Sequence, residues 1–131
     1  MQNCYCGFEK SFEECCGKFI TGINKPNTAE ELMRSRYSAY VTVSVPYILK
    51  TTHSSTRNLY DSNAIKEWAI SSKWIKLEII QTKKGKLQDE EGFVEFKATY
   101  KDADNHTIVH HEYSSFLKEK GEWFFVEGKS V

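Results

Sequence analysis

No stretch of the 131 residues approaches the roughly 20 consecutive apolar residues that a membrane-spanning helix requires. Charged and polar residues lie between Lys10 and Lys18, where a secretory signal would have an apolar run. Too few residues precede Cys4 for a leader, so we also expect no lipid-modified N-terminus. These absences predict a cytoplasmic chain with no membrane span.

The chain also lacks an excess of charge of either sign. Its 18 basic and 18 acidic side chains cancel, so a broad basic surface for generic nucleic-acid binding is not expected. Phosphate-cradling glycine loops, dinucleotide-binding fingerprints and the H-E-x-x-H metalloprotease motif are absent as well. A hydrophobic share of 40% is nevertheless enough for the core of one domain.

Cysteine is missing from every position after residue 16, because all four thiols are gathered as Cys4, Cys6, Cys15 and Cys16. In a reducing cytoplasm, clustered thiols indicate a metal site. Four thiolates match the closed tetrahedral shell of a structural zinc ion. We predict that a short helical turn from near Phe12 brings the second pair to the ion. The predicted cofactor is therefore structural Zn²⁺.

Other uses of four cysteines remain open. Two disulfides would need an oxidising compartment, and a bridge between the adjacent Cys15 and Cys16 would be strained. A redox-active pair normally has C-x-x-C spacing, which this cluster lacks. Four thiolates can also hold an iron–sulfur cluster, and the ligand type alone does not separate zinc from iron. A catalytic zinc is disfavoured, because four sulfur ligands leave no open position.

The segment around the cysteines is too short to fold by burying apolar surface alone. Zinc binding to such peptides contributes roughly 10–16 kcal/mol at pH 7, enough to order a module of residues 1–20. Aromatic and basic side chains between the cysteines would then form a small recognition surface. The candidates for this partner surface are Tyr5, Phe8, Lys10 and Phe12.

The spacing C-x-C-x8-C-C followed by glycine resembles the SEC-C motif, a zinc-binding element named for its occurrence at the C-terminus of the SecA translocation ATPase. Much of the remaining chain resembles the bacterial YchJ-like family. The segments that carry this second resemblance are Leu32–Tyr40, Thr52–Arg57, Gly92–Phe96 and Gly121–Trp123. It implies a cone-shaped α+β domain of the nuclear-transport-factor-two type, with no established activity. The SecA module contacts partners, so a protein or other macromolecular partner for the zinc module is implied by analogy.

Hydrophobic periodicity predicts the helices independently of the resemblance. After a linker at residues 18–27, a capping box and an apolar stripe predict a helix over 28–42. Shorter helices are predicted over 47–51 and over 61–72, the last with Ala64 among its inward residues.

After these helices the period of the pattern changes to two, which predicts antiparallel strands. Ile75, Leu77 and Ile79 alternate with charged residues, and a long strand over 107–118 and a last one over 123–126 follow. We therefore expect residues 28–131 to be an α+β domain with three helices packed on a curved antiparallel sheet.

One charged residue, Arg36, lies in the middle of the apolar stripe of the longest predicted helix. A guanidinium that faces a core must be paired. Arg36 is therefore a member of a buried ion pair, an anion anchor inside a pocket, or a rim residue if the helix phase is shifted. His110 and Glu112 are its candidate partners if their face of strand 107–118 lines the interior.

An open cone interior would be lined by four candidate residues, Arg36, Tyr40, His53 and Glu112. His53 lies among serine and threonine hydroxyls, which together with a histidine and an arginine suit a phosphate or a carboxylate. The alternative is a loop in which these hydroxyls satisfy backbone groups. Glu112 would be an ordinary surface residue if its face of the strand were exposed to solvent.

Three functions remain open. The leading hypothesis is a non-enzymatic binding or adaptor protein acting through the zinc module, because a closed zinc site has no reaction to perform. The second is a small-molecule binder or an enzyme that uses the cone interior. The third is a purely structural zinc that staples the N-terminus onto the domain. Domains of this type often pair through their sheets, so a homodimer is the default expectation.

Overall fold

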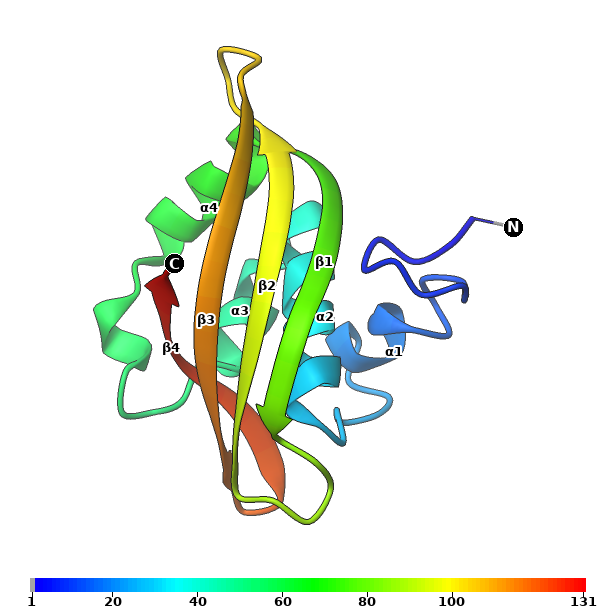
Figure 1. The fold of residues 1–131 in the computed structure, drawn as a ribbon, viewed down its shortest axis with the longest axis vertical. Helices are drawn as coiled ribbons and strands as arrows, with labels where there is room; N and C mark the ends of the chain where they lie inside the picture. Colours follow the sequence, from blue (N-terminus) through cyan, green and yellow to red (C-terminus); the bar gives the residue numbers. More distant parts are fainter. Residues whose placement is uncertain (1) are drawn as a thin grey trace.

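The computed structural model describes residues 2–131 as a curved sheet packed on helices, with a small N-terminal module at one side (Figure 1). The helices are α1 (Cys16–Ile20), α2 (Ala29–Val41), α3 (Val45–Lys50), the 3₁₀ turn η1 (Arg57–Leu59) and α4 (Ser62–Ser71). The strands are β1 (Lys73–Lys84), β2 (Glu91–Lys101), β3 (Thr107–Glu119) and β4 (Glu122–Ser130). The predicted α+β class is confirmed, with all strands following the helices.

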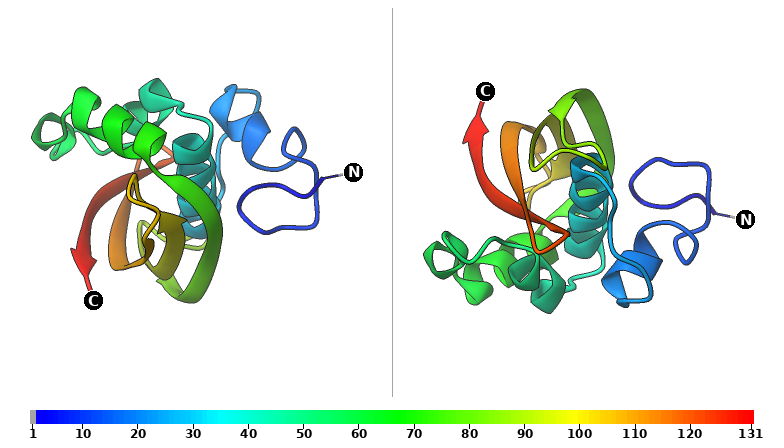
Figure 2. Two further views of the ribbon diagram at one scale, coloured as in Figure 1. Left: turned by 90° about the horizontal axis from the view of Figure 1, so that it is seen from above. Right: turned by 90° about the horizontal axis from the view of Figure 1, so that it is seen from below.

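The sheet is an antiparallel meander in the order β1-β2-β3-β4. Its register shifts twice in β1, at Trp74–Lys76 and at Ile79–Gln81, and once in the β3–β4 pair beside Ser115. Bulges of this kind bend a strand and increase its twist. The sheet accordingly curls around α2, which lies in its concave face (Figure 2).

Helix α2 begins and packs as its sequence predicts. The Thr28 side chain accepts a hydrogen bond from the backbone N–H of Glu31, which caps the helix. The apolar stripe that includes Leu32, Met33 and Tyr37 is buried against the sheet. Burial of this stripe fixes the rotation of α2, and therefore fixes where its polar residues point.

The predicted short turn from near Phe12 is present. Ser11 caps it through Glu14, the carbonyl of Phe12 accepts from the N–H groups of both Cys15 and Gly17, and α1 follows from Cys16. The number of helices differs from the prediction, because residues 2–131 contain α1 and η1 beyond the three helices expected for the cone.

The predicted inward residues also need correction at two positions. Ala64 is exposed, since α4 turns Ile65 and Ala69 toward the core. Ile75 is 49% exposed, because the register shift after Trp74 breaks the alternation and turns Trp74 inward instead. The last strand extends to Ser130, well past the predicted end.

No helix among the described residues 2–131 is long and apolar enough to cross a membrane.

Candidate metal centre and cone cavity

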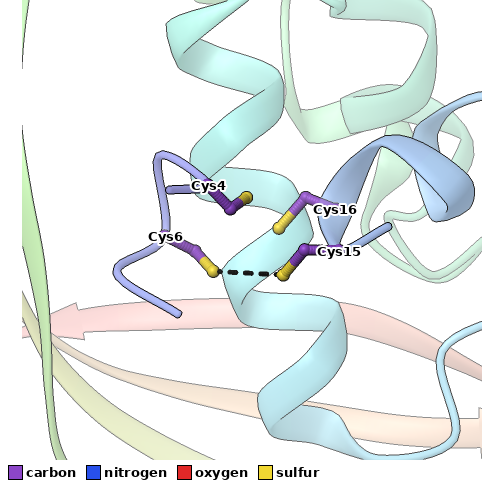
Figure 3. A group of neighbouring side chains, drawn as sticks. All are labelled: Cys4, Cys6, Cys15 and Cys16. Carbon is purple, nitrogen blue, oxygen red and sulfur yellow. Dashed lines mark hydrogen bonds between the residues drawn. The ribbon is translucent and has the colours of Figure 1, made fainter. Parts of the chain in front are cut away.

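The four cysteines come together at the junction of the N-terminal loop and α1 (Figure 3). All four are buried and unbridged, and their sulfur atoms all lie within 4.8 Å of one another. The Sγ atoms of Cys6 and Cys15 are 3.6 Å apart. Soft sulfur donors converging in this way are the ligand set of a structural zinc or iron site. The cluster could hold a metal ion.

Local backbone contacts bring the first pair of cysteines to the second. The N–H of Cys4 donates to the carbonyl of Lys10 at 2.7 Å, which closes the loop, and Gly7 turns it with a φ of 101° that favours glycine. Cys15 and Cys16 stand at the start of α1. The spacing between the two cysteine pairs is thus explained by one closed loop followed by one tight turn.

Crowding of the thiols changes their acidities in opposite directions. A hydrogen bond from the Cys16 thiol is the main cause that lowers the pKa of Cys6 to about 5. Burial, together with the nearby charge of Cys6, raises the pKa of Cys15 to about 12, and the hydrogen bond to Cys6 raises that of Cys16. One thiol therefore ionises easily, and its negative charge opposes the ionisation of the next thiol. A divalent cation would remove this repulsion. The donor set therefore suits a metal ion.

Helix α2 holds the cysteine loop from the other side. The guanidinium of Arg34 donates from Nη1 to the carbonyl of Cys6 at 2.7 Å and from Nε to Glu30 at 2.9 Å, and it covers the Phe8 ring at 3.9 Å. The Oγ of Ser38 lies 3.7 Å from the Sγ of Cys4. The cysteines thereby join the same buried cluster as the core residues of the sheet.

We predict that Arg34→Lys weakens metal retention by about tenfold or more. The guanidinium donates to Glu30 and to the Cys6 carbonyl at the same time, and a lysine ammonium cannot reproduce this geometry. The measurement is the rate at which a chromogenic chelator removes metal from the purified protein. Arg57→Lys is the matched control, since Arg57 also donates from Nε to a backbone carbonyl, that of Thr52, but away from the cysteines. Equal release from the wild type and Arg34→Lys would contradict the prediction.

The candidate partner surface is only partly exposed. Tyr5 and Phe8 are 48% and 38% exposed, and Lys10 is exposed as well. Phe12 is not available in the same way, because it packs against the core cluster and meets the Tyr5 ring edge-on at 5.5 Å.

The cone holds a cavity of about 200 Å³, partly open to solvent, between α2, α4 and the concave face of the sheet. Arg36, Tyr40 and Glu112 line it, as expected of an open interior. Its walls are mainly aromatic, and they include Tyr60, Trp68, Trp74, Phe96 and Phe125. The interior is therefore hollow rather than filled with side chains.

Arg36 is only 6% exposed, and burial lowers the pKa of its guanidinium from the ordinary value. Its Nη1 donates to the carbonyl of Ile48 at 2.8 Å and to the hydroxyls of Thr51 and Thr52 at 2.8 and 3.3 Å. The guanidinium also lies over the Phe125 ring at 4.3 Å. The predicted ion pair is wrong: no acidic oxygen in residues 2–131 lies within 4.0 Å of this cation.

Glu112 faces the same cavity but is committed to other partners. His110 Nε2 lies 2.8 Å from Oε1, and the hydroxyl of Ser114 donates to Oε2. The carboxylate also lies directly against Gly128 of β4, where a Cβ atom would come 2.1 Å from Oε2. Only glycine leaves room for this carboxylate at the wall of the cavity.

A family model described as "YchJ, middle NTF2-like domain" matches residues 28–128, which is the whole cone. The chain belongs to the YchJ family. The resemblance stated from the sequence is thereby confirmed, and the cone-shaped domain is of the nuclear-transport-factor-two type.

Relatives of this YchJ-family chain match it over nearly its whole length. A UPF0225 protein of Geobacter sulfurreducens is 45% identical over 128 residues, which are 98% of this chain and 79% of that protein. A UPF0225 protein of Haemophilus influenzae is 39% identical over 127 residues, 97% of this chain and 77% of that protein. The names of these relatives state no activity.

Two solved structures share the fold of the YchJ-family chain, the cysteine module included. The solution structure of a SEC-C motif containing protein from Rhodopseudomonas palustris aligns with a TM-score of 0.91 and 34% identity, covering 99% of both chains. The crystal structure of a SEC-C motif containing protein from Psychrobacter arcticus aligns with a TM-score of 0.83 and 33% identity, covering 100% of this chain and 84% of the other.

One predicted pocket residue of the YchJ-family chain, His53, does not line the cavity. The neighbouring Thr52 pairs with Phe125 of β4 and turns inward to Arg36, so the next side chain points outward. There the ring of His53 contacts Glu119 and Ser55. The hydroxyls after it bond within the loop and to β4, in agreement with the alternative that they satisfy backbone groups.

Three cavity residues, Tyr60, Trp74 and Gly128, are not among the pocket residues predicted from the sequence. The bulge in β1 breaks the alternation of inward and outward residues, so the inward position of Trp74 could not be predicted from the pattern. Tyr60 and Gly128 carry no periodic signal, since each meets the cavity only because β4 lies beside the segment that follows α3.

The ionised Glu112 should make part of the stability of the YchJ-family chain depend on pH. Burial opposes ionisation, but the hydrogen bonds from His110 and Ser114 outweigh it and lower the pKa of this carboxyl from 4.5. A lowered native pKa adds stability above the ordinary value, and that stability is lost as the pH falls through the native pKa. We expect Glu112→Gln to cost about 1–3 kcal/mol at pH 7 and to flatten the loss toward pH 3.

Urea unfolding of the wild type and of Glu112→Gln between pH 7 and pH 3 measures this difference. Glu78→Gln is the control, because Glu78 is exposed and its nitrogen–oxygen distance to Lys76 is 3.7 Å. Parallel curves for the wild type and Glu112→Gln would show that this carboxylate does not carry the pH dependence.

Proposed function

We propose that this YchJ-family protein binds a small molecule inside its cone, and that the four-cysteine module holds a structural zinc ion. The observation that supports a ligand most strongly is the cavity of about 200 Å³ into which a buried arginine turns. Water-sized voids in a packed core do not reach this volume, and a concave apolar site with a few convergent polar groups is the usual form of a ligand pocket.

The zinc ion has a structural role in this proposal. Cys4, Cys6, Cys15 and Cys16 would hold it, and a closed shell of four thiolates would supply cross-linking rather than chemistry. The cysteines belong to the main buried cluster, so the ion would staple the N-terminal loop to α2. Elemental analysis of protein purified without added metal tests the identity of the ion. Stoichiometric iron in place of zinc would reject the zinc assignment.

Filling the cavity tests the ligand proposal. Ala98 is buried in its wall, and Ala98→Leu would occupy part of the space. We expect small compounds that raise the melting temperature of the wild type to have no effect on Ala98→Leu. Val109→Leu is the control, because Val109 is 52% exposed and lies on the same sheet. Compounds that stabilise all three proteins equally would bind elsewhere and would reject the cavity as the site.

A second candidate function is docking of a partner macromolecule by the cysteine module. Its support is the exposure of Tyr5 and Phe8 beside a rigid buried cluster, with Lys10 nearby. Rigid aromatic side chains on a small scaffold are typical anchors of protein interfaces. The double variant Phe8→Ser, Lys10→Glu should lose a partner captured by the wild type from cell lysate while keeping its metal. An unchanged set of captured proteins would reject this function.

A further inference from the structure

The guanidinium of Arg36 has unused hydrogen-bond donors. Every hydrogen bond that it makes to protein leaves from Nη1. Within the described residues, no buried side-chain nitrogen or oxygen lacks a partner, so Nε and Nη2 must reach accessible space. Arg36 lines the cavity and is only 6% exposed, so we infer that these two nitrogens face the cavity.

These two nitrogens form the edge of a guanidinium that binds carboxylates with two parallel hydrogen bonds. The edge is also held in place. Nη1 is fixed by the segment that ends α3, and the plane of the group rests on Phe125. A donor pair that is fixed before the ligand arrives loses little conformational freedom on binding.

Two phenol groups lie near the same charge. Tyr40 and Tyr60 both line the cavity, where burial raises the pKa of each phenol and the nearby positive charge of Arg36 opposes that shift. Neither hydroxyl makes a hydrogen bond to protein within residues 2–131, and Tyr60 is 36% exposed. Both O–H groups are thus free to donate to a ligand.

A carboxylate that lines the same cavity favours a ligand with one negative charge. The Glu112 carboxylate contributes a negative charge of its own, and it is fixed against Gly128 by His110 and Ser114. It cannot reach Arg36 to neutralise it without leaving these partners. Glu112 repels any anion in the cavity, and burying a dianion costs more desolvation energy than burying a monoanion, so a single negative charge is favoured.

The size and the walls of the cavity define the rest of the ligand. A dry cavity of about 150 Å³ is enough for benzene, so 200 Å³ accepts one ring and a small substituent. Trp68 packs against Tyr40 and Trp74 with ring centroids 5.2 and 5.5 Å apart. An aromatic wall of this kind favours a flat apolar body packed against it.

We propose that the cavity binds a small monocarboxylic acid with a flat, ring-sized body, and that its carboxylate pairs with Nε and Nη2 of Arg36. This inference rests on the proposed function, because it names the ligand class of the same cavity. The hydroxyls of Tyr40 and Tyr60 donate to the carboxylate, and the ring lies against the aromatic wall that Trp68 and Trp74 form.

The test uses a matched series of probes on the full metal-loaded chain. Benzoate, benzamide, benzylamine and phenyl phosphate share one ring and differ in the charge of the head group. Isothermal titration calorimetry and line broadening of the probe in NMR spectra measure their affinities. We expect benzoate to bind at least about tenfold more tightly than benzamide, because a charge-assisted pair is roughly twice as strong as a neutral one. Arg36→Met should abolish this preference.

The results separate the carboxylate inference from the broader proposal that the cavity binds a small molecule. Binding of benzamide or benzylamine as tight as that of benzoate overturns the carboxylate inference but keeps the cavity as a binding site. Tighter binding of phenyl phosphate overturns the restriction to one charge. No binding of any probe to the wild type overturns the inference and the proposed function for ligands of this size. Benzoate binding that survives both Arg36→Met and Ala98→Leu assigns the acid to another surface and also overturns the inference.

Discussion

Replacing Cys6 by serine is expected to lower the melting temperature by about 10–20 °C. The change removes one thiolate from a closed shell, and the metal is lost with it. The N-terminal module then detaches from α2 and exposes Phe12 and Phe19, which pack against the two buried clusters. Re-exposing two large side chains costs about 3–6 kcal/mol. Differential scanning calorimetry measures the shift.

A chelator provides the control for this first prediction. Wild-type protein stripped of metal should melt at the temperature of Cys6→Ser, and the chelator should not change the variant further. If the wild type melted at one temperature with and without chelator, the metal would not be part of the folded structure. A loss confined to the local signal of the N-terminal loop would show that the cone folds independently of it.

Replacing Arg36 by methionine is expected to stabilise the protein by about 1–3 kcal/mol while abolishing acid binding. The arginine is a buried cation with no ion pair among residues 2–131, so its desolvation is offset by neutral oxygens, by the Phe125 ring and by the more distant charge of Glu112. The acceptors keep other partners after the change, because the hydroxyls of Thr51 and Thr52 also donate to the carbonyl of Ile48. Methionine fills much of the same space.

Urea unfolding at pH 7 measures the second prediction. Arg57→Met is the matched control, since Arg57 also bonds the same segment but is exposed, and it should change stability by less than about 0.5 kcal/mol. A large loss of stability in Arg36→Met would show that the arginine is a structural element of the core. Ligand binding would then be supported by the cavity alone.

Local signals made much of this protein predictable from its sequence. The capping box at Thr28 and the apolar stripe after it gave the position and the buried face of α2. The spacing of Cys4, Cys6, Cys15 and Cys16 was sufficient to predict a converging cluster, because it needs only one closed loop and one turn. In each case the residues that decide the outcome are neighbours along the chain.

The residues that were misplaced depend on contacts between distant segments. Arg36 was correctly placed among the apolar residues of its helix, but its partners come from the end of α3, whose position is set by pairing with β4. The same pairing turns His53 outward. Gly128 matters only because the Glu112 carboxylate lies against it across the sheet. The hydrophobic periodicity of a single segment does not predict which distant segments it will contact.

Helix α2 touches both sites, with Arg34 and Ser38 one turn apart toward the cysteines and Arg36 and Tyr40 one turn apart toward the cavity. A rigid helix between two sites makes their occupancies thermodynamically linked whenever both depend on its position. Any acid that binds more tightly to the metal-loaded form must raise the affinity for the metal by the same factor. The retention of the ion would then report the concentration of the acid.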